Sequence, residues 1–197
     1  MDEPYEKYDL GNHVLEIHQD SDPENNPRKD FDGNITTMVC FHKRYNLGDL
    51  HGYNKNHYQS WDELKNAIVQ NEKVRIIKPL FMYEHSGITI ATSPYTCRWD
   101  SGQIGWVFVT RDRLRRMGLL HKHTRTIERY LEGEVEQYDQ YLRGDVYGFM
   151  LYRKGEQESQ DACWGFYGDD PLKNGMIDHF PEEVATALRE KLGKKAA

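Results

Sequence analysis

Strand-like and helix-like spacings of apolar residues alternate along this chain. Residues 36–43 are β-branched and aromatic, which is typical of a strand, and residues 73–84 and 88–93 flank a short turn that indicates a hairpin. A weakly alternating segment and three later apolar segments are also expected to be strands: 14–19, 106–109, 145–154 and 162–167.

Helix-like spacing is clearest over residues 124–142, where apolar residues three or four positions apart predict a long amphipathic helix. Ser60 and Glu63 form a capping box that opens another helix, because each side chain can satisfy the backbone amide of the other residue. Shorter helices are expected after Thr110, a suitable N-cap, and over residues 181–192.

These elements predict an α+β fold in a single domain of residues 1–197. We expect an antiparallel or mixed sheet with two or three helices packed on one side. Residues 20–32 and 44–58 are rich in Asp, Asn, Gly or Pro, so they are expected to be long loops. The acidic segment 1–32 is therefore expected to be partly loop.

The composition indicates an intracellular protein without membrane or secretory character. The chain contains no run of ~18 apolar residues, and its acidic first residues do not resemble a signal peptide. The cysteines Cys40, Cys97 and Cys163 are widely spaced and odd in number, so we expect free thiols in a reducing compartment. A cytoplasmic location follows from these features.

The charge is unevenly distributed along the chain. The formal net charge is −6, yet residues 110–129 hold seven Arg or Lys residues and two acidic ones. Such a basic segment can bind an anionic partner such as nucleic acid, or it can be neutralised by the acidic segments once the chain folds.

The signatures of common nucleotide-binding, metalloprotease and serine hydrolase sites are absent from the chain. Nine histidines are present, but they do not group with Cys or carboxylate residues at the spacing of zinc ligands. We therefore expect no cofactor and no native metal site.

Residues 95–103 form the most informative segment, because a glycine-containing loop carries a thiol, a guanidinium, an indole and a carboxylate. Three interpretations stay open. Cys97 is a nucleophile activated by a histidine, or Arg98 binds an anionic group while Trp99 stacks on a partner, or Trp99 plugs the core.

Two other segments, 40–49 and 161–170, also run from a strand into a loop with charged and aromatic residues. If the loops meet, the carboxylates in and near them could act as a metal or general-base cluster: Asp100, Asp161, Asp169 and Asp170.

The motifs CFHKRYNLGD, PYTCRWDSGQIGW and DACWGFYGDD resemble a family of uncharacterised proteins from bacteriophages, prophages and other mobile elements. The resemblance covers most of residues 10–170. It implies a bacteriophage accessory protein in the cytoplasm of a host cell, and it implies no catalytic residues. Small accessory proteins of this kind often inhibit host defence systems.

The sequence therefore favours a non-enzymatic inhibitor of a host defence system, which binds a protein or an anionic or nucleotide ligand through polar aromatic loops. Arg side chains would recognise anionic groups, and Trp or Tyr would anchor the partner. The expected binding residues are Arg44, Tyr45, Arg98, Trp99, Asp100, Gln103, Trp164 and Tyr167.

Two alternatives belong to other classes of function. The first is a small enzyme that uses Cys97 or Cys163 with His42 or His85, or a metal bound by aspartates. The second is a nucleic-acid-binding protein that uses the basic residues of segment 110–129: Arg111, Arg113, Arg115, Arg116, Lys122, Arg125 and Arg129.

Overall fold

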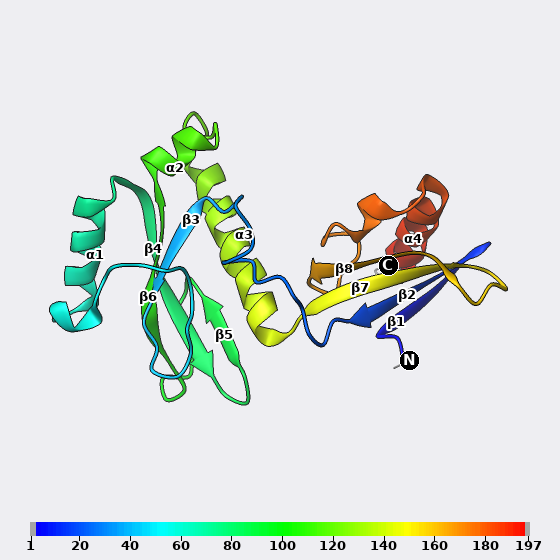
Figure 1. The fold of residues 1–197 in the computed structure, drawn as a ribbon, viewed down its shortest axis with the longest axis horizontal. Coiled ribbons are helices and arrows are strands. Elements are labelled where there is room, and N and C mark those ends of the chain that lie inside the picture. The colour runs from blue at the N-terminus through cyan, green and yellow to red at the C-terminus, as the bar shows by residue number, and fades with distance from the viewer. Residues whose placement is uncertain (1–2, 196–197) are drawn as a thin grey trace. The chain divides into compact units, whose positions relative to one another are not determined.

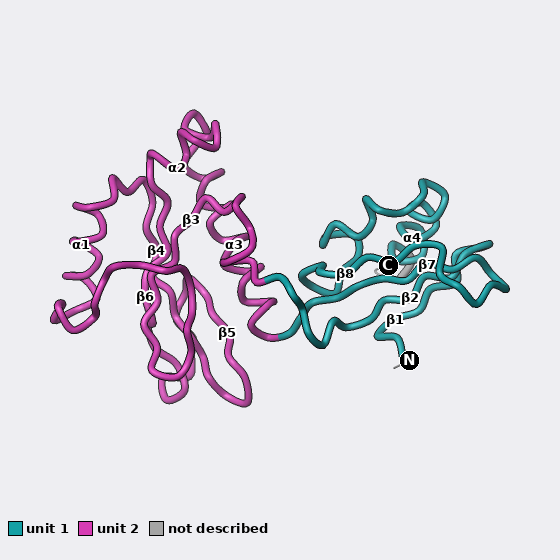
Figure 2. The backbone as a smooth tube through the Cα atoms, viewed as in Figure 1, with its two compact units in different colours: residues 1–25, 144–197 teal, residues 26–143 magenta. Residues whose placement is uncertain are grey.

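The computed structural model describes residues 3–195. It confirms the α+β class, since two antiparallel four-stranded sheets combine with α-helices. The chain forms two compact units (Figure 2). Unit 1 comprises Met1–Asn25 and Gly144–Ala197, and unit 2 comprises Asn26–Arg143.

Unit 1 holds an antiparallel sheet in the order β1-β2-β7-β8, drawn at the right of Figure 1. A 3-10 helix, Met176–His179, and helix α4, Glu182–Lys195, supply apolar side chains that pack against the strands. The strands are β1 (Glu6–Leu10), β2 (His13–Gln19), β7 (Val146–Arg153) and β8 (Ser159–Tyr167).

Strand β1 was not among the strands predicted from the sequence, where the acidic segment 1–32 was expected to be partly loop. Tyr8 and Leu10 of this strand are buried, while Lys7 and Asp9 between them point outward and pair with Glu16 and Lys154. Apolar and charged residues do alternate along β1, but over too few positions to predict a strand in so acidic a segment.

Unit 2 holds the second sheet, in the order β3-β6-β4-β5, with every neighbouring pair antiparallel. Its strands are β3 (Thr36–Cys40), β4 (Val74–Glu84), β5 (Ile88–Ala91) and β6 (Ser101–Thr110). A 3-10 turn, Lys55–His57, precedes the helices α1 (Trp61–Asn71), α2 (Arg111–Arg116) and α3 (Thr124–Arg143).

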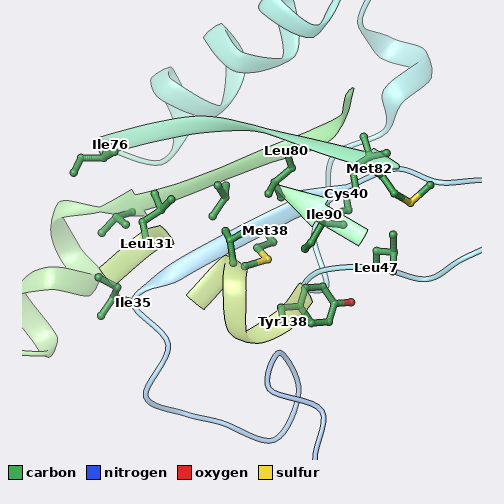
Figure 3. Packing of buried hydrophobic residues seen from close by; sticks show 14 of the residues in the cluster. Ile35, Met38, Cys40, Leu47, Ile76, Leu80, Met82, Ile90, Leu131 and Tyr138 are labelled. Carbon is green, nitrogen blue, oxygen red and sulfur yellow. The ribbon is translucent and has the colours of Figure 1, made fainter. Parts of the chain in front are cut away.

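Helices cover both faces of the unit 2 sheet, and not one face as expected (Figure 1). Met38 and Val107 face α3 and form the larger core shown in Figure 3, whereas Val39 and Phe108 face α1. Neighbouring residues on β3 and β6 are therefore apolar on both faces, which requires a helix on each side.

Strand β6 is longer than expected, because it begins at Ser101 and not at Trp106. Glycine permits the extension, since a Cβ on Gly105 would lie 1.9 Å from the backbone oxygen of Val39 on β3. Gln103 consequently lies on a strand, and only the preceding residues form a loop.

A buried arginine ties the long N-terminal loop of unit 2 to its sheet and to α3. Arg28 donates to Asp49 at 2.5 and 3.0 Å, to Glu134 at 3.2 Å, and to the hydroxyl and carbonyl of Thr36. Glu134 also accepts from the backbone amides of Ile35 and Thr36, at 2.6 and 3.1 Å. This network fixes the chain on both sides of the loop that carries Arg44.

Candidate functional site

A cavity of about 410 Å³ opens in unit 2 where strands β4 and β6 meet the loop that follows β3. The strand order explains the meeting, because Cys40 at the end of β3 pairs with Gly105 on β6. Residues from these three segments and from the loop before β6 line the cavity: His42, Arg44, Met82, Glu84, Trp99, Asp100, Ser101, Gly102, Gln103 and Ile104. Four of the expected binding residues are among them: Arg44, Trp99, Asp100 and Gln103.

Arg44, Tyr45 and His42 form a connected group on one wall of this cavity. The guanidinium of Arg44 binds the Glu84 carboxylate and lies 5.6 Å from the centre of the Tyr45 ring. The His42 imidazole stacks on Tyr45, with ring centres 5.1 Å apart. Tyr45 thus belongs to the site as a neighbour of its lining residues.

The tautomer of His42 follows from its hydrogen bonds. Its Nδ1 accepts from the backbone amides of Arg44 and Tyr45, each at 3.3 Å, so a neutral ring carries its proton on Nε2. That nitrogen lies 3.8 Å from Glu84 Oε2.

Glu84 is a carboxylate at the centre of this group. The hydrogen bond from Arg44 lowers the pKa of Glu84, and the same pair raises the pKa of Arg44. Both groups therefore stay charged at neutral pH. Sequence analysis missed Glu84, and the available signal was its position as the last residue of β4 before a hairpin turn.

Trp99 lies in the loop before β6, where it lines the cavity and is 95% exposed. Hydrogen bonds hold the backbone of this loop on both sides of Trp99 in the sequence. The amide of Glu84 donates to the Asp100 carbonyl at 2.8 Å, and the Ser101 hydroxyl donates to the Cys97 carbonyl. Trp99 is therefore not a core plug, and that interpretation is wrong.

Arg98 and Gln103 differ in how they relate to the cavity. Arg98 is exposed and forms no ion pair with any residue of 3–195, so its guanidinium is available to a partner. The Gln103 side chain lines the cavity and donates to the Gly105 carbonyl at 3.1 Å, which holds it along strand β6.

Cys97 and His85 do not form the direct Cys–His pair that the enzyme alternative requires. The Cys97 thiol lies 3.7 Å from Asp100 Oδ2, and His85 Nδ1 lies 3.7 Å from the same oxygen. A carboxylate thus stands between thiol and imidazole, whereas a cysteine nucleophile needs its base at hydrogen-bond distance. Burial raises the pKa of the Cys40 thiol to about 12, and Cys163 lies in unit 1.

The other two expected binding residues, Trp164 and Tyr167, belong to strand β8 of unit 1. Trp164 lies over Gly148 of β7, where an added Cβ would be 2.2 Å from an indole carbon, and it is 48% exposed. The Tyr167 hydroxyl donates to the backbone carbonyl of Asn25 at 2.8 Å.

Two of the four carboxylates that could form an acidic cluster are engaged by neighbouring side chains in unit 1. Asp169 accepts from Tyr5 at 3.2 Å, and Asp170 pairs with Lys173 at 2.6 Å. Within residues 3–195, no group of three or more His, Cys, Asp or Glu side chains is arranged to hold a metal ion.

The basic segment occupies α2, the following loop and the first half of α3. Arg113 donates to the carbonyl of Asn34 at 2.7 Å, and Arg115 pairs with Asp112 at 2.6 Å. Five others form no ion pair with any residue that the structure describes: Arg111, Arg116, Lys122, Arg125 and Arg129.

The comparisons with known proteins return no match. No family model matches the chain, no curated protein is significantly similar to it, and no solved structure matches its fold. Among the described helices, none is both long and apolar enough to cross a membrane.

Proposed function

We propose that this protein is a non-enzymatic binding protein that engages a partner protein through a surface centred on Trp99. The single observation that carries the proposal is the 95% exposure of Trp99, which is one of the residues lining a preformed cavity. An indole that contacts water over almost its whole surface contributes little to the core, but it can anchor an interface.

The neighbouring residues support a protein partner. Tryptophan, tyrosine and arginine are enriched in the energetically dominant positions of protein interfaces. Trp99 lines the cavity, Tyr45 stacks on the lining residue His42, and Arg98 directly precedes Trp99 in the chain. Arg44 is bound to Glu84, so Arg98 is the arginine that meets an acidic group of the partner. The paired charges of Arg44 and Glu84 instead offer hydrogen-bonding groups to polar residues of the partner at the edge of the Trp99 surface.

The motif resemblance supplies the biological setting of the proposal. In a bacteriophage accessory protein acting in the host cytoplasm, the partner is a host defence protein, and binding inhibits it. A small anionic or nucleotide ligand of that defence system is the alternative occupant of the cavity.

The test compares Trp99→Ala with Tyr130→Ala, which removes another exposed aromatic side chain of unit 2 outside the cavity. Partners captured from host lysate by the wild-type protein are identified by mass spectrometry and then titrated as purified proteins. Removing a contact anchor costs ~2–4 kcal/mol, so Trp99→Ala lowers affinity about thirtyfold or more.

Thermal melts complete this test. Trp99→Ala keeps the melting temperature of the wild type, because the indole makes little contact with the core. Unchanged affinity in a well-folded Trp99→Ala protein contradicts the proposal. Cys97→Ser is expected to retain binding, and complete loss of function in that folded variant would favour the enzyme alternative.

The five unpaired basic residues favour a second candidate function, which is weak binding of nucleic acid. Phosphate contacts release counterions, so affinity for a short duplex should fall steeply as salt rises, and charge reversal at Arg125 and Arg129 should reduce that slope. The net charge of −6 opposes tight binding at physiological salt.

A further inference from the structure

Unit 1 contains a separate cavity of about 340 Å³ between strand β8 and the loop that follows β2. Trp164 and Tyr167 line it from the strand, and Asp20, Asp22 and Glu24 line it from the loop. Its volume is near the lower end of the ~300–1,000 Å³ typical of ligand sites, which suits a group the size of one side chain.

The walls of this cavity are held in place by hydrogen bonds at both ends of the loop. The amide of Asp20 donates to Val146 O on β7 at 2.7 Å, at the start of the loop. At its far end, the Tyr167 hydroxyl donates to Asn25 O at 2.8 Å. The cavity therefore exists before any ligand enters.

The indole of Trp164 is a flat wall that the fold supports from behind. The ring lies directly over Gly148, where any larger residue would collide with it, and 48% of the side chain stays exposed. Strands β7 and β8 shift register at this point, which leaves Trp164 outside the regular ladder. An exposed indole face attracts cations through its negative quadrupole.

The charge of the lining has one sign. None of the residues around the cavity is Lys or Arg, and three are carboxylates. Asp20 accepts the amide of Asp22 at 3.2 Å, whereas the carboxylates of Asp22 and Glu24 have no hydrogen-bond or ion-pair partner among residues 3–195. Their acceptor oxygens are therefore available to a ligand that donates hydrogen bonds and carries positive charge.

We infer that this cavity binds a guanidinium group, the side chain of an arginine on a partner protein. A guanidinium is planar, so it stacks on one indole face while its N–H groups reach the carboxylates. A quaternary ammonium donates no hydrogen bond, and an ammonium stacks less well on a single ring. This site is distinct from the Trp99 surface of unit 2, and it does not depend on the proposed function.

The experiment titrates the full-length protein with N-acetyl-arginine amide and follows the indole N–H resonances by NMR. The chain has four tryptophans, and the missing signal in Trp164→Phe assigns the one that matters. N-acetyl-citrulline amide is the matched probe, because it has nearly the same shape without the charge. N-acetyl-lysine amide carries the charge without the planar head.

We expect a saturable shift of the Trp164 signal with the arginine probe, at an affinity of roughly 1–10 mM for so small a ligand. The lysine probe binds more weakly, and the citrulline probe gives no saturable shift. Asp22→Asn with Glu24→Gln weakens the arginine probe about five- to tenfold. The matched control, Glu156→Gln with Glu158→Gln, removes two exposed carboxylates of the β7–β8 turn and leaves binding unchanged.

Four results would overturn the inference. These are no saturable shift with the arginine probe, equal binding of the citrulline probe, equal or tighter binding of the lysine probe, and undiminished binding by the Asp22→Asn, Glu24→Gln protein. Trp99→Ala should bind the arginine probe like the wild type, so a failure here is separable from a failure of the proposed function.

Discussion

Arg28 and Arg44 lie in the same unit, and each binds carboxylates, but the two contacts do different things. The side chain of Arg28 is 2% exposed and binds Asp49, Glu134 and Thr36, whereas that of Arg44 is 66% exposed and pairs with Glu84. A desolvated charge must be fully paired, while an exposed pair is weakened by the surrounding water. Burial therefore separates the arginine that stabilises the fold from the arginine whose ion pair contributes polar groups to the Trp99 surface.

The same division runs through the motif CFHKRYNLGD. His42 and Arg44 line the cavity, and Tyr45 stacks on His42. Leu47 is buried, and Gly48 has a φ of +72° with its amide donating to the Tyr138 hydroxyl at 3.1 Å. One half of the motif thus presents side chains to solvent, and the other half holds the loop that presents them.

The largest expected effect comes from breaking the buried contact. Arg28→Ala leaves two carboxylates without their cation, so it should lower the free energy of unfolding by about 3–5 kcal/mol. Arg44→Ala is the matched control and should change stability little, because an exposed pair is largely replaced by water. Urea denaturation of both variants measures the difference.

Equal destabilisation by the two substitutions would contradict this comparison. It would mean that the Arg44–Glu84 contact supports the fold as strongly as the buried network does. The Trp99 surface would then have to be reassigned as part of the structural framework.

A second, smaller effect separates two glycines of strand β6. A Cβ on Gly105 would lie 1.9 Å from Val39 O, a backbone atom that cannot move alone, whereas one on Gly102 would meet nothing within 4 Å. Gly105→Ala should therefore cost at least ~1–3 kcal/mol, and Gly102→Ala should leave stability unchanged or slightly raised. Paired thermal melts test this, and similar melts for the two variants would show that β3 and β6 can separate at little cost.

Local sequence signals predicted the elements of the fold well. The capping box is confirmed, since Ser60 Oγ accepts from the amide of Glu63 at 3.1 Å, and Thr110 caps α2 in the same way at 3.0 Å. These signals work because both partners lie within one helical turn of each other.

Long-range partners could not be predicted in this way. Arg28 and Glu134 are separated by 106 positions, and nothing local to either residue identifies the other. The site itself depends on the strand order, which brings the end of β3 beside β6 and β4. The sequence did identify the chemistry of Arg44, Trp99 and Asp100, but it gave no means to separate them from Asp49, whose loop looks equally polar.

The smallest expected effect concerns the pH dependence of the exposed pair. Arg44 lowers the pKa of Glu84 from its ordinary value of 4.5, so the folded state holds this carboxylate in its charged form more strongly than the unfolded state does. The stabilisation is therefore complete above the ordinary pKa and is lost as the pH falls through the lowered one. Glu84→Gln removes the stabilisation by the Arg44–Glu84 pair at every pH. The melting temperatures of wild type and Glu84→Gln should differ by a small, constant amount between about pH 7 and pH 5 and converge below about pH 4.5.

Glu136→Gln on α3 is the control and should show no such convergence, because Glu136 has no ion-pair partner among residues 3–195. A difference that widens as the pH falls would show that Glu84 is stabilised in its protonated form, and it would remove the charged pair from the rim of the Trp99 surface.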